Sequence, residues 1–113
     1  MKEQTRMMLP ALERIAPWQG QDRWICGAWL ILRIGSNITV QYHGATVARI
    51  ICDSVVHASA VIAALGEVMP NARHEHELYH ALGFTDEHGI SADFQSPTQR
   101  YARWNKWAKE VKA

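Results

Sequence analysis

The sequence predicts an α+β fold in a single domain, residues 1–113, from the order of its apolar patterns. A segment with helical periodicity comes first, three strand-like runs separated by short turns follow, and three segments bounded by helix caps or breaks fill the second half. At 113 residues the chain is long enough to bury one hydrophobic core without disulfides. We therefore expect an N-terminal helix, a three-stranded antiparallel meander, and three helices packed on the sheet.

The first helix and the sheet are expected in the first half of the chain. Apolar residues at helical spacing end at Pro17, which cannot continue a helix. The first strand-like run is apolar on both faces, as in a central strand, and places Trp24 and Trp29 on opposite faces. Turn signals at Gly35-Ser36 and His43-Gly44 join it to two further runs. The expected helix is residues 3–16, and the expected strands are residues 24–34, 37–42 and 46–52.

Three more helices are expected after the sheet. Asp53 or Ser54 can cap the first of them, and Gly83 can end the second in a left-handed conformation. Ser96, a first-turn proline and Gln99 form a capping-box pattern that starts the last. The expected helices are residues 54–68, 72–82 and 97–113.

Composition indicates a soluble, cytoplasmic protein. The formal charge of +1 gives no overall attraction to nucleic acid or to membranes. The longest apolar run, residues 24–32, is far shorter than the roughly 20 residues of a membrane-spanning helix. Charged residues interrupt residues 1–18, unlike a signal peptide. Cys26 and Cys52 lie in apolar runs without metal-binding spacing, which predicts buried free thiols in a reducing compartment.

Residues 74–88 are the stretch with the clearest chemical pattern, because they hold four of the six histidines. Within them His76, Glu77 and His80 spell H-E-x-x-H. On a helix, His76 and His80 lie one turn apart on one face, where both imidazoles can bind one metal ion. Glu77 lies beside them and can take a proton from metal-bound water. The spacing therefore indicates a candidate zinc site.

The motif continues through Gly83 and Asp86 as H-E-x-x-H-x-x-G-x-x-D. Over residues 76–86 this pattern resembles the active-site signature of the metzincin zinc peptidases. The resemblance implies a zinc-dependent peptidase, with zinc as its cofactor. The residues it assigns are, as zinc ligands, His76, His80 and Asp86 and, as general base, Glu77. If zinc is bound without catalysis, His88 can replace Asp86 as a ligand.

The C-terminal helix is a second candidate site because basic and aromatic residues alternate along it. Basic side chains can neutralise phosphates while aromatic rings stack on bases, so contact with nucleic acid or another partner is possible. The alternative is a helix whose Trp104, Ala108 and Val111 face the core while its lysines face water. The candidate binding residues are Arg100, Arg103, Trp104, Lys106 and Trp107.

Two classes of function stay open. The first is the zinc peptidase. The second is a small non-enzymatic interaction protein of the kind that phages and mobile elements encode, either an inhibitor of another protein or a nucleic-acid accessory factor. It would act through the C-terminal helix or through a sheet face that binds a protein partner or a second copy. The chain has no methionine beyond Met69 to form the turn that metzincins place after the helix, and the expected helix at 54–68 has no counterpart there.

Overall fold

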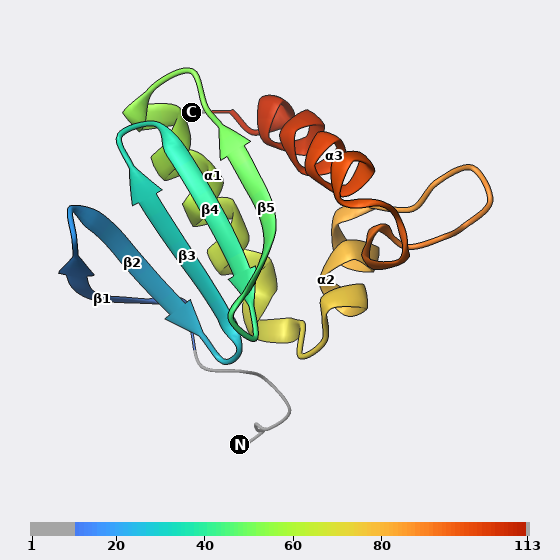
Figure 1. Cartoon of the computed structure of the whole chain (residues 1–113), viewed down its shortest axis with the longest axis horizontal. Helices are drawn as coiled ribbons and strands as arrows, with labels where there is room; N and C mark the ends of the chain where they lie inside the picture. Colours follow the sequence, from blue (N-terminus) through green and yellow to red (C-terminus); the bar gives the residue numbers. More distant parts are fainter. Residues whose placement is uncertain (1–10, 113) are drawn as a thin grey trace.

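Five antiparallel strands precede all the helices in the computed structural model, which describes residues 11–112. The strands form one sheet in chain order, so each strand pairs with its neighbours in the sequence (Figure 1). They are β1 (Glu13–Trp18), β2 (Gln21–Cys26), β3 (Trp29–Ile34), β4 (Asn37–Tyr42) and β5 (Ala45–Ile51). Every connection between strands is therefore a hairpin.

Two-residue turns with left-handed backbone make these hairpins. The two turns that the sequence predicts, Gly35-Ser36 and His43-Gly44, are confirmed, with φ of 59° at Gly35 and of 51° and 82° at the second pair. Two more turns, at Gln19-Gly20 and Gly27-Ala28, also have positive φ. Positive φ at the first or at both turn residues gives the backbone twist that matches paired strands.

The predicted three-stranded meander behind an N-terminal helix is wrong. The sheet has five strands, because residues 13–18 extend the sheet as β1 and because Gly27, with φ of 59°, splits the predicted strand 24–34 into β2 and β3. Pairing with β2 supplies the backbone hydrogen bonds of β1, which overrides the helical spacing of its apolar residues. The rest of the predicted helix, residues 3–10, lies outside the described part of the chain.

The predicted placement of Trp24 and Trp29 on opposite faces is also wrong. Because the hairpin at Gly27 aligns Cys26 with Trp29 and Trp24 with Ile31, both indoles lie on the same face of the sheet. Trp29 is fully buried there, and its Nε1–H donates to the carbonyl oxygen of Ala72 at 3.2 Å. This face is the inner side of the sheet.

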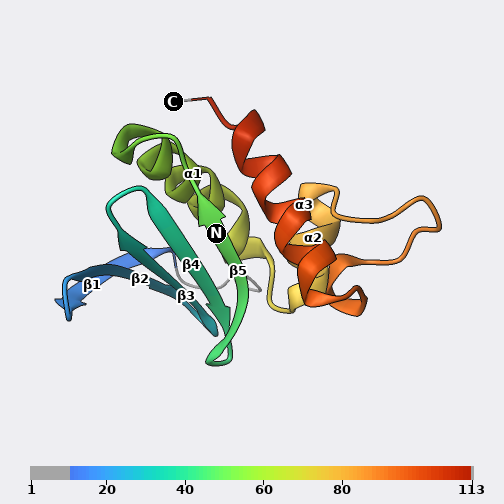
Figure 2. The same ribbon diagram turned by 45° about the horizontal axis from the view of Figure 1, so that its top comes forward.

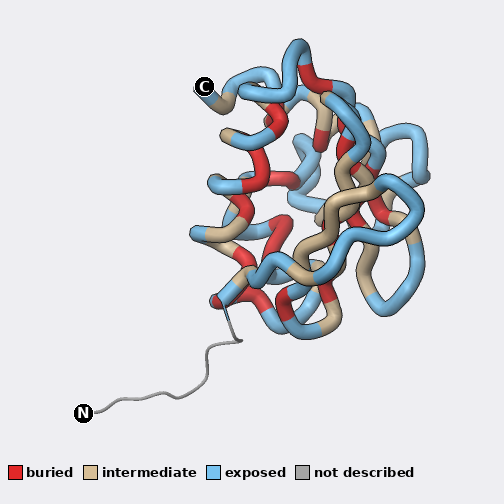
Figure 3. The backbone as a smooth tube through the Cα atoms, turned by 90° about the vertical axis from the view of Figure 1, so that its left-hand side faces the viewer, coloured by how far each residue is buried: buried red, intermediate tan, exposed pale blue. Residues whose placement is uncertain are grey.

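Helix α1 (Val55–Val68) covers the inner face (Figure 2). The Ser54 hydroxyl caps it by accepting the N–H of His57 at 3.0 Å. Its apolar stripe is buried against the strands, at Ala58, Val61, Ile62 and Leu65. Figure 3 shows the buried positions gathered in the interior of the molecule and the exposed ones on its outside. One face of the sheet is thus packed into the core.

The remaining helices continue from α1 and lie beyond the β5 side of the sheet (Figure 1). They are η1 (Met69–Asn71), α2 (Glu75–Leu82), η2 (Ala92–Phe94) and α3 (Pro97–Glu110). Helix α3 runs beside strand β5, where Nε of Arg100 donates to the carbonyl oxygen of Val47 at 3.1 Å. None of the helices among residues 11–112 is long and apolar enough to cross a membrane.

The end of α3 is also joined to the start of α1. The Nε2 atom of His57 lies 2.8 Å from the carbonyl oxygen of Ala108 and 3.1 Å from that of Val111. Carbonyl groups at a helix C-terminus lack partners within the helix, so this ring satisfies groups that would otherwise face water. The first and last described helices therefore hold each other in place.

Candidate functional site

The H-E-x-x-H residues lie on α2, as the sequence predicts. His76 and His80 are both exposed, and both line a depression of about 480 Å³ between α2 and the following loop. The loop side of the depression consists of Thr85, Gly89, Ile90, Ser91 and Phe94. The structure therefore brings the two predicted histidine ligands to one surface.

Glu77 is engaged in capping α2. Its Oε1 atom accepts the backbone N–H groups of His74 and Arg73, each at 2.9 Å. These hydrogen bonds, that from His74 foremost, lower the pKa of Glu77 below its ordinary value. The carboxylate satisfies donors at the helix start that have no partner in the helix, so Glu77 has a structural role at this position.

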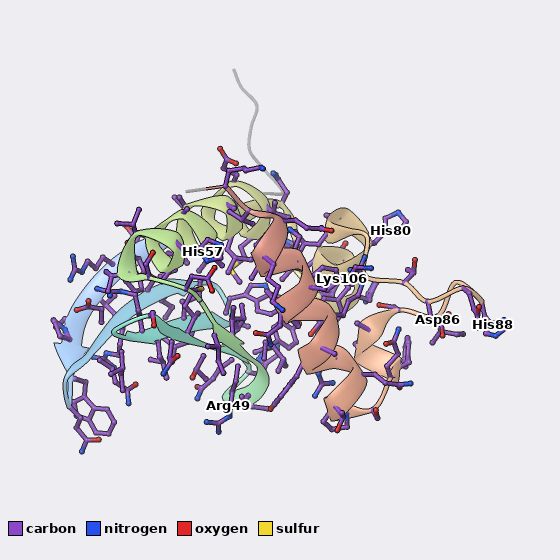
Figure 4. The ribbon with its side chains drawn as sticks, turned by 90° about the horizontal axis from the view of Figure 1, so that it is seen from above. Arg49, His57, His80, Asp86, His88 and Lys106 are labelled. Carbon is purple, nitrogen blue, oxygen red and sulfur yellow. The ribbon has the colours of Figure 1, made fainter. Side chains whose placement is uncertain are left out.

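Gly83 and Asp86 likewise take part in local structure. Gly83 ends α2 with φ of 77°. The Oδ1 atom of Asp86 accepts the backbone N–H groups of His88 and Ile90, at 2.9 and 2.8 Å, within its own loop. Figure 4 shows Asp86 and His88 out on this loop, separate from His80 on the helix. Neither Asp86 nor His88 lines the depression that His76 and His80 share.

These residues do not fit a zinc ligand set. Within residues 11–112, no group of three or more His, Cys, Asp or Glu side chains is placed to hold a metal ion. A catalytic zinc needs three protein ligands and an open position, and α2 supplies two imidazoles. The helix cap and the loop turn also each hold one carboxylate oxygen, Oε1 of Glu77 and Oδ1 of Asp86. We derive no reaction step through zinc.

The two tryptophans of α3 pack against other aromatic rings. Trp104 is fully buried and packs edge-on against Tyr79 and Phe84, with ring centroids 5.8 and 5.3 Å apart. Trp107 is half-buried against the same Phe84. Because a buried indole cannot stack on a base, Trp104 forms core structure here.

The predicted basic residues of α3 divide into two groups. Arg100 bonds to β5, and Arg103 donates to the carbonyl oxygen of Gly83 at 2.9 Å while its guanidinium lies over Phe84. Lys106, by contrast, is exposed (Figure 4). The two arginines therefore anchor α3 to neighbouring backbone, whereas Lys106 faces water.

The outer face of the sheet, opposite α1, is not covered by any described element (Figure 2). The register places three cross-strand rows on strands β2 to β5 of this outer face. The rows are Ile25, Leu30, Gln41 and Thr46; Arg23, Leu32, Thr39 and Arg49; and Ile34, Asn37 and Ile51. In Figure 4 the side chain of Arg49 points away from α1.

The outer face is hollowed and partly apolar. A depression of about 400 Å³ crosses it, lined by residues of all three rows, among them Leu32, Thr39 and Arg49. Three isoleucines on the outer face are exposed, and Ile51 is 72% exposed. When one face of a sheet is turned toward water, the alternate residues on that face are usually polar. These exposed apolar residues therefore indicate a contact surface.

An open sheet face is predictable from the sequence, but its residues are not. Gly27 was the missing signal: a hairpin there fixes the register that puts Arg23 and Arg49 in one row. Reading residues 24–34 as one strand hides this row, because a change of one strand boundary changes the pairing of every later residue.

Comparisons with protein-family models, with curated proteins and with solved structures give no significant match to this chain.

Proposed function

We propose that the protein is a non-enzymatic binding module whose outer sheet face contacts a protein partner in the cytoplasm. The observation that carries the proposal is the exposure of Ile25, Ile34 and Ile51 around a depression on the uncovered face of the sheet. Burying such side chains against a partner gives about 25 cal/mol for each Å² removed from water. Cys26 and Cys52 are both buried, and burial raises the pKa of both thiols, so they stay protonated and unreactive, as suits a reducing cytoplasm.

A protein fits this face better than nucleic acid does. Strands β2 to β5 present no aromatic side chain on the outer face, which leaves the exposed Trp18 of β1, paired with Gln21 at the margin of this face, as the ring on which a base could stack. Trp104 and Trp107 of α3 are packed against other rings. Two arginines among the eleven residues of the three rows also provide few phosphate contacts.

A binding role also agrees with the hydrogen bonds that the predicted catalytic side chains make to the backbone. Glu77 bonds to the backbone at the start of α2, and Asp86 bonds to its own loop. A general base must reach the proton that it removes, and a carboxylate that caps a helix is held away from that task. Glu77 and Asp86 therefore have local structural roles that need no catalytic function.

Site-specific photo-crosslinking in the cells that naturally contain the protein tests this proposal. A photoreactive amino acid at Thr39 lies in the centre of the outer face, and the same amino acid at Glu67 lies exposed on α1. We expect a discrete protein adduct from position 39 that is absent from position 67. Adding Ile51→Asp should abolish the adduct without loss of folding.

Two results would overturn the proposal. Equal crosslinking from both positions would show that the outer face has no special role. Crosslinks that join position 39 to nucleic acid would assign the outer face to a different class of partner.

A further inference from the structure

The two arginines of the outer face are separated by the width of one helix. Arg23 on β2 and Arg49 on β5 are the ends of one row, with Leu32 and Thr39 between them. Neighbouring strands lie about 4.8 Å apart, so three steps give about 14 Å between the two backbones. An α-helix with its side chains is about 10–12 Å wide. A single helix laid along the strands would fill this space.

The apolar side chains between the two arginines are spaced like the residues of one helix face. Leu30, Leu32 and Ile34 follow each other along β3 on the outer face. Alternate residues of a strand are about 7 Å apart, and residues four apart on a helix rise by about 6 Å. One apolar stripe of a helix therefore matches this line of apolar side chains. The polar residues of β4 lie beside this line and can contact the polar residues that border the apolar stripe of the helix.

The charge of the outer face indicates which side chains such a helix would carry on its two flanks. Arg49 is exposed and has no carboxylate partner among residues 11–112, and Arg23 is held by donating Nε–H to the carbonyl oxygen of Ala16 at 2.9 Å. Strands β2 to β5 carry no carboxylate on this face, and Glu13 on β1 lies at its corner, opposite Ile25. Acidic side chains on both flanks of a helix would meet the two arginines.

Other occupants match the outer face less well. A second copy would bring four arginines together against two glutamates, which is unfavourable without further acidic groups. Addition of a strand needs a free, regular sheet edge. Side chains of α3 occupy the β5 edge, and the other edge, β1, is six residues long, contains Pro17 and has an irregular register. We infer that the partner presents an acidic amphipathic α-helix that lies along β3 and β4 between Arg23 and Arg49. This inference rests on the proposed function.

A pair of synthetic peptides tests the inference on the full chain. Each is a capped 18-residue helix with one leucine stripe, flanked by glutamates in one peptide and by lysines in the other. By amide NMR titration at low salt, we expect the glutamate peptide to shift the signals of Leu32, Thr39 and Arg49. The lysine peptide should leave those signals in place.

Charge reversal provides the specific control. Arg49→Glu, at an exposed position, should weaken binding of the glutamate peptide by about threefold or more, because it removes one exposed ion pair and places like charges together. Arg23→Glu together with Arg49→Glu should make the lysine peptide the better ligand. Lys106→Glu makes the same charge change outside the outer face and should leave both affinities unchanged.

Several results would overturn the inference. These are shifts confined to α3, equal affinity for both peptides, or no binding of either peptide. If neither peptide binds while position 39 still crosslinks to a protein, the partner is not an acidic helix but the proposed function stands. If position 39 also fails to crosslink, both are wrong. A concentration-dependent dimer whose interface shifts Thr39 would assign the outer face to a second copy.

Discussion

The side-chain amide of Asn105 acts as a neighbouring strand for Ile51. The backbone N–H of Ile51 donates to Oδ1 of Asn105 at 3.0 Å, and Nδ2 of Asn105 donates to the carbonyl oxygen of Arg49 at 2.8 Å. With the bond from Arg100 to Val47, helix α3 satisfies three outward backbone groups of β5. A sheet edge with free backbone groups would be a template for pairing with another chain, and α3 closes it.

Replacing Asn105 with alanine should therefore destabilise the protein and open the edge. Two backbone groups of β5 lose their partner, which costs about 1–3 kcal/mol in the free energy of unfolding. Urea denaturation measures this loss, and light scattering should detect concentration-dependent association. Lys106→Ala, at the next and exposed position, should change the free energy of unfolding by less than about 0.5 kcal/mol. Equal effects of the two variants would contradict the closing role of Asn105.

Alanine should have opposite effects at two glycines. Gly83 ends α2 with φ of 77°, where a Cβ meets no atom but the backbone conformation is strained, so Gly83→Ala should cost about 1–2 kcal/mol. Gly66 lies inside α1, where a Cβ would make ordinary contact with Leu12 at 3.6 Å. Gly66→Ala should stabilise by up to about 1 kcal/mol through helix propensity. Thermal and urea unfolding of both variants check the signs.

Glu77 should contribute a pH-dependent part of the stability. Hydrogen bonds from the backbone lower its pKa in the folded state below the ordinary value of 4.5, so its contribution is fully present above that pH. The contribution is lost as the pH falls from 4.5 through the lower folded value. Glu77→Gln keeps an acceptor oxygen but does not titrate, so its stability should fall less steeply with acid. Urea midpoints between about pH 6 and pH 3 compare the two proteins. A parallel decline would show that the cap is not formed.

A metal assay separates the zinc prediction from the binding module. We expect well below one zinc per chain in protein purified without a histidine tag, because Asp86 bonds within its own loop and α2 offers two imidazoles. Elemental analysis of the wild type, His80→Ala and Asp86→Ala makes the measurement. Near one zinc per chain that is lost in both variants would support the metzincin-like ligand set. In that case Glu77→Gln should keep the metal and lose peptidase turnover.

Elements with local signals were predictable from the sequence. The Ser54 and Ser96 caps, the left-handed Gly83 and the apolar stripe of α1 each act within a few residues, and the helices begin and end near the expected positions. Strand β1 was not predictable in this way. Its residues are mostly exposed, and pairing with β2 decides their conformation.

The candidate sites depended on contacts that spacing does not encode. H-E-x-x-H correctly put His76 and His80 on one side of a helix, yet the same letters serve as a capping pattern when Glu77 turns back to the backbone. In the same way, alternating arginine and tryptophan in α3 reads as a nucleic-acid surface. Only the position of α3 against β5 and Phe84 reveals that Trp104 is core and that Arg100 and Arg103 bond to carbonyl oxygens.

The chain-order sheet has a consequence for synthesis on the ribosome. Each strand can pair with the one made just before it, so all five are available once Ile51 has emerged. The groups that close the β5 edge lie about fifty residues further on, at Arg100 and Asn105. Until these have been made, the nascent sheet has an open edge. Between the synthesis of β5 and that of α3, the β5 edge can therefore pair with another chain.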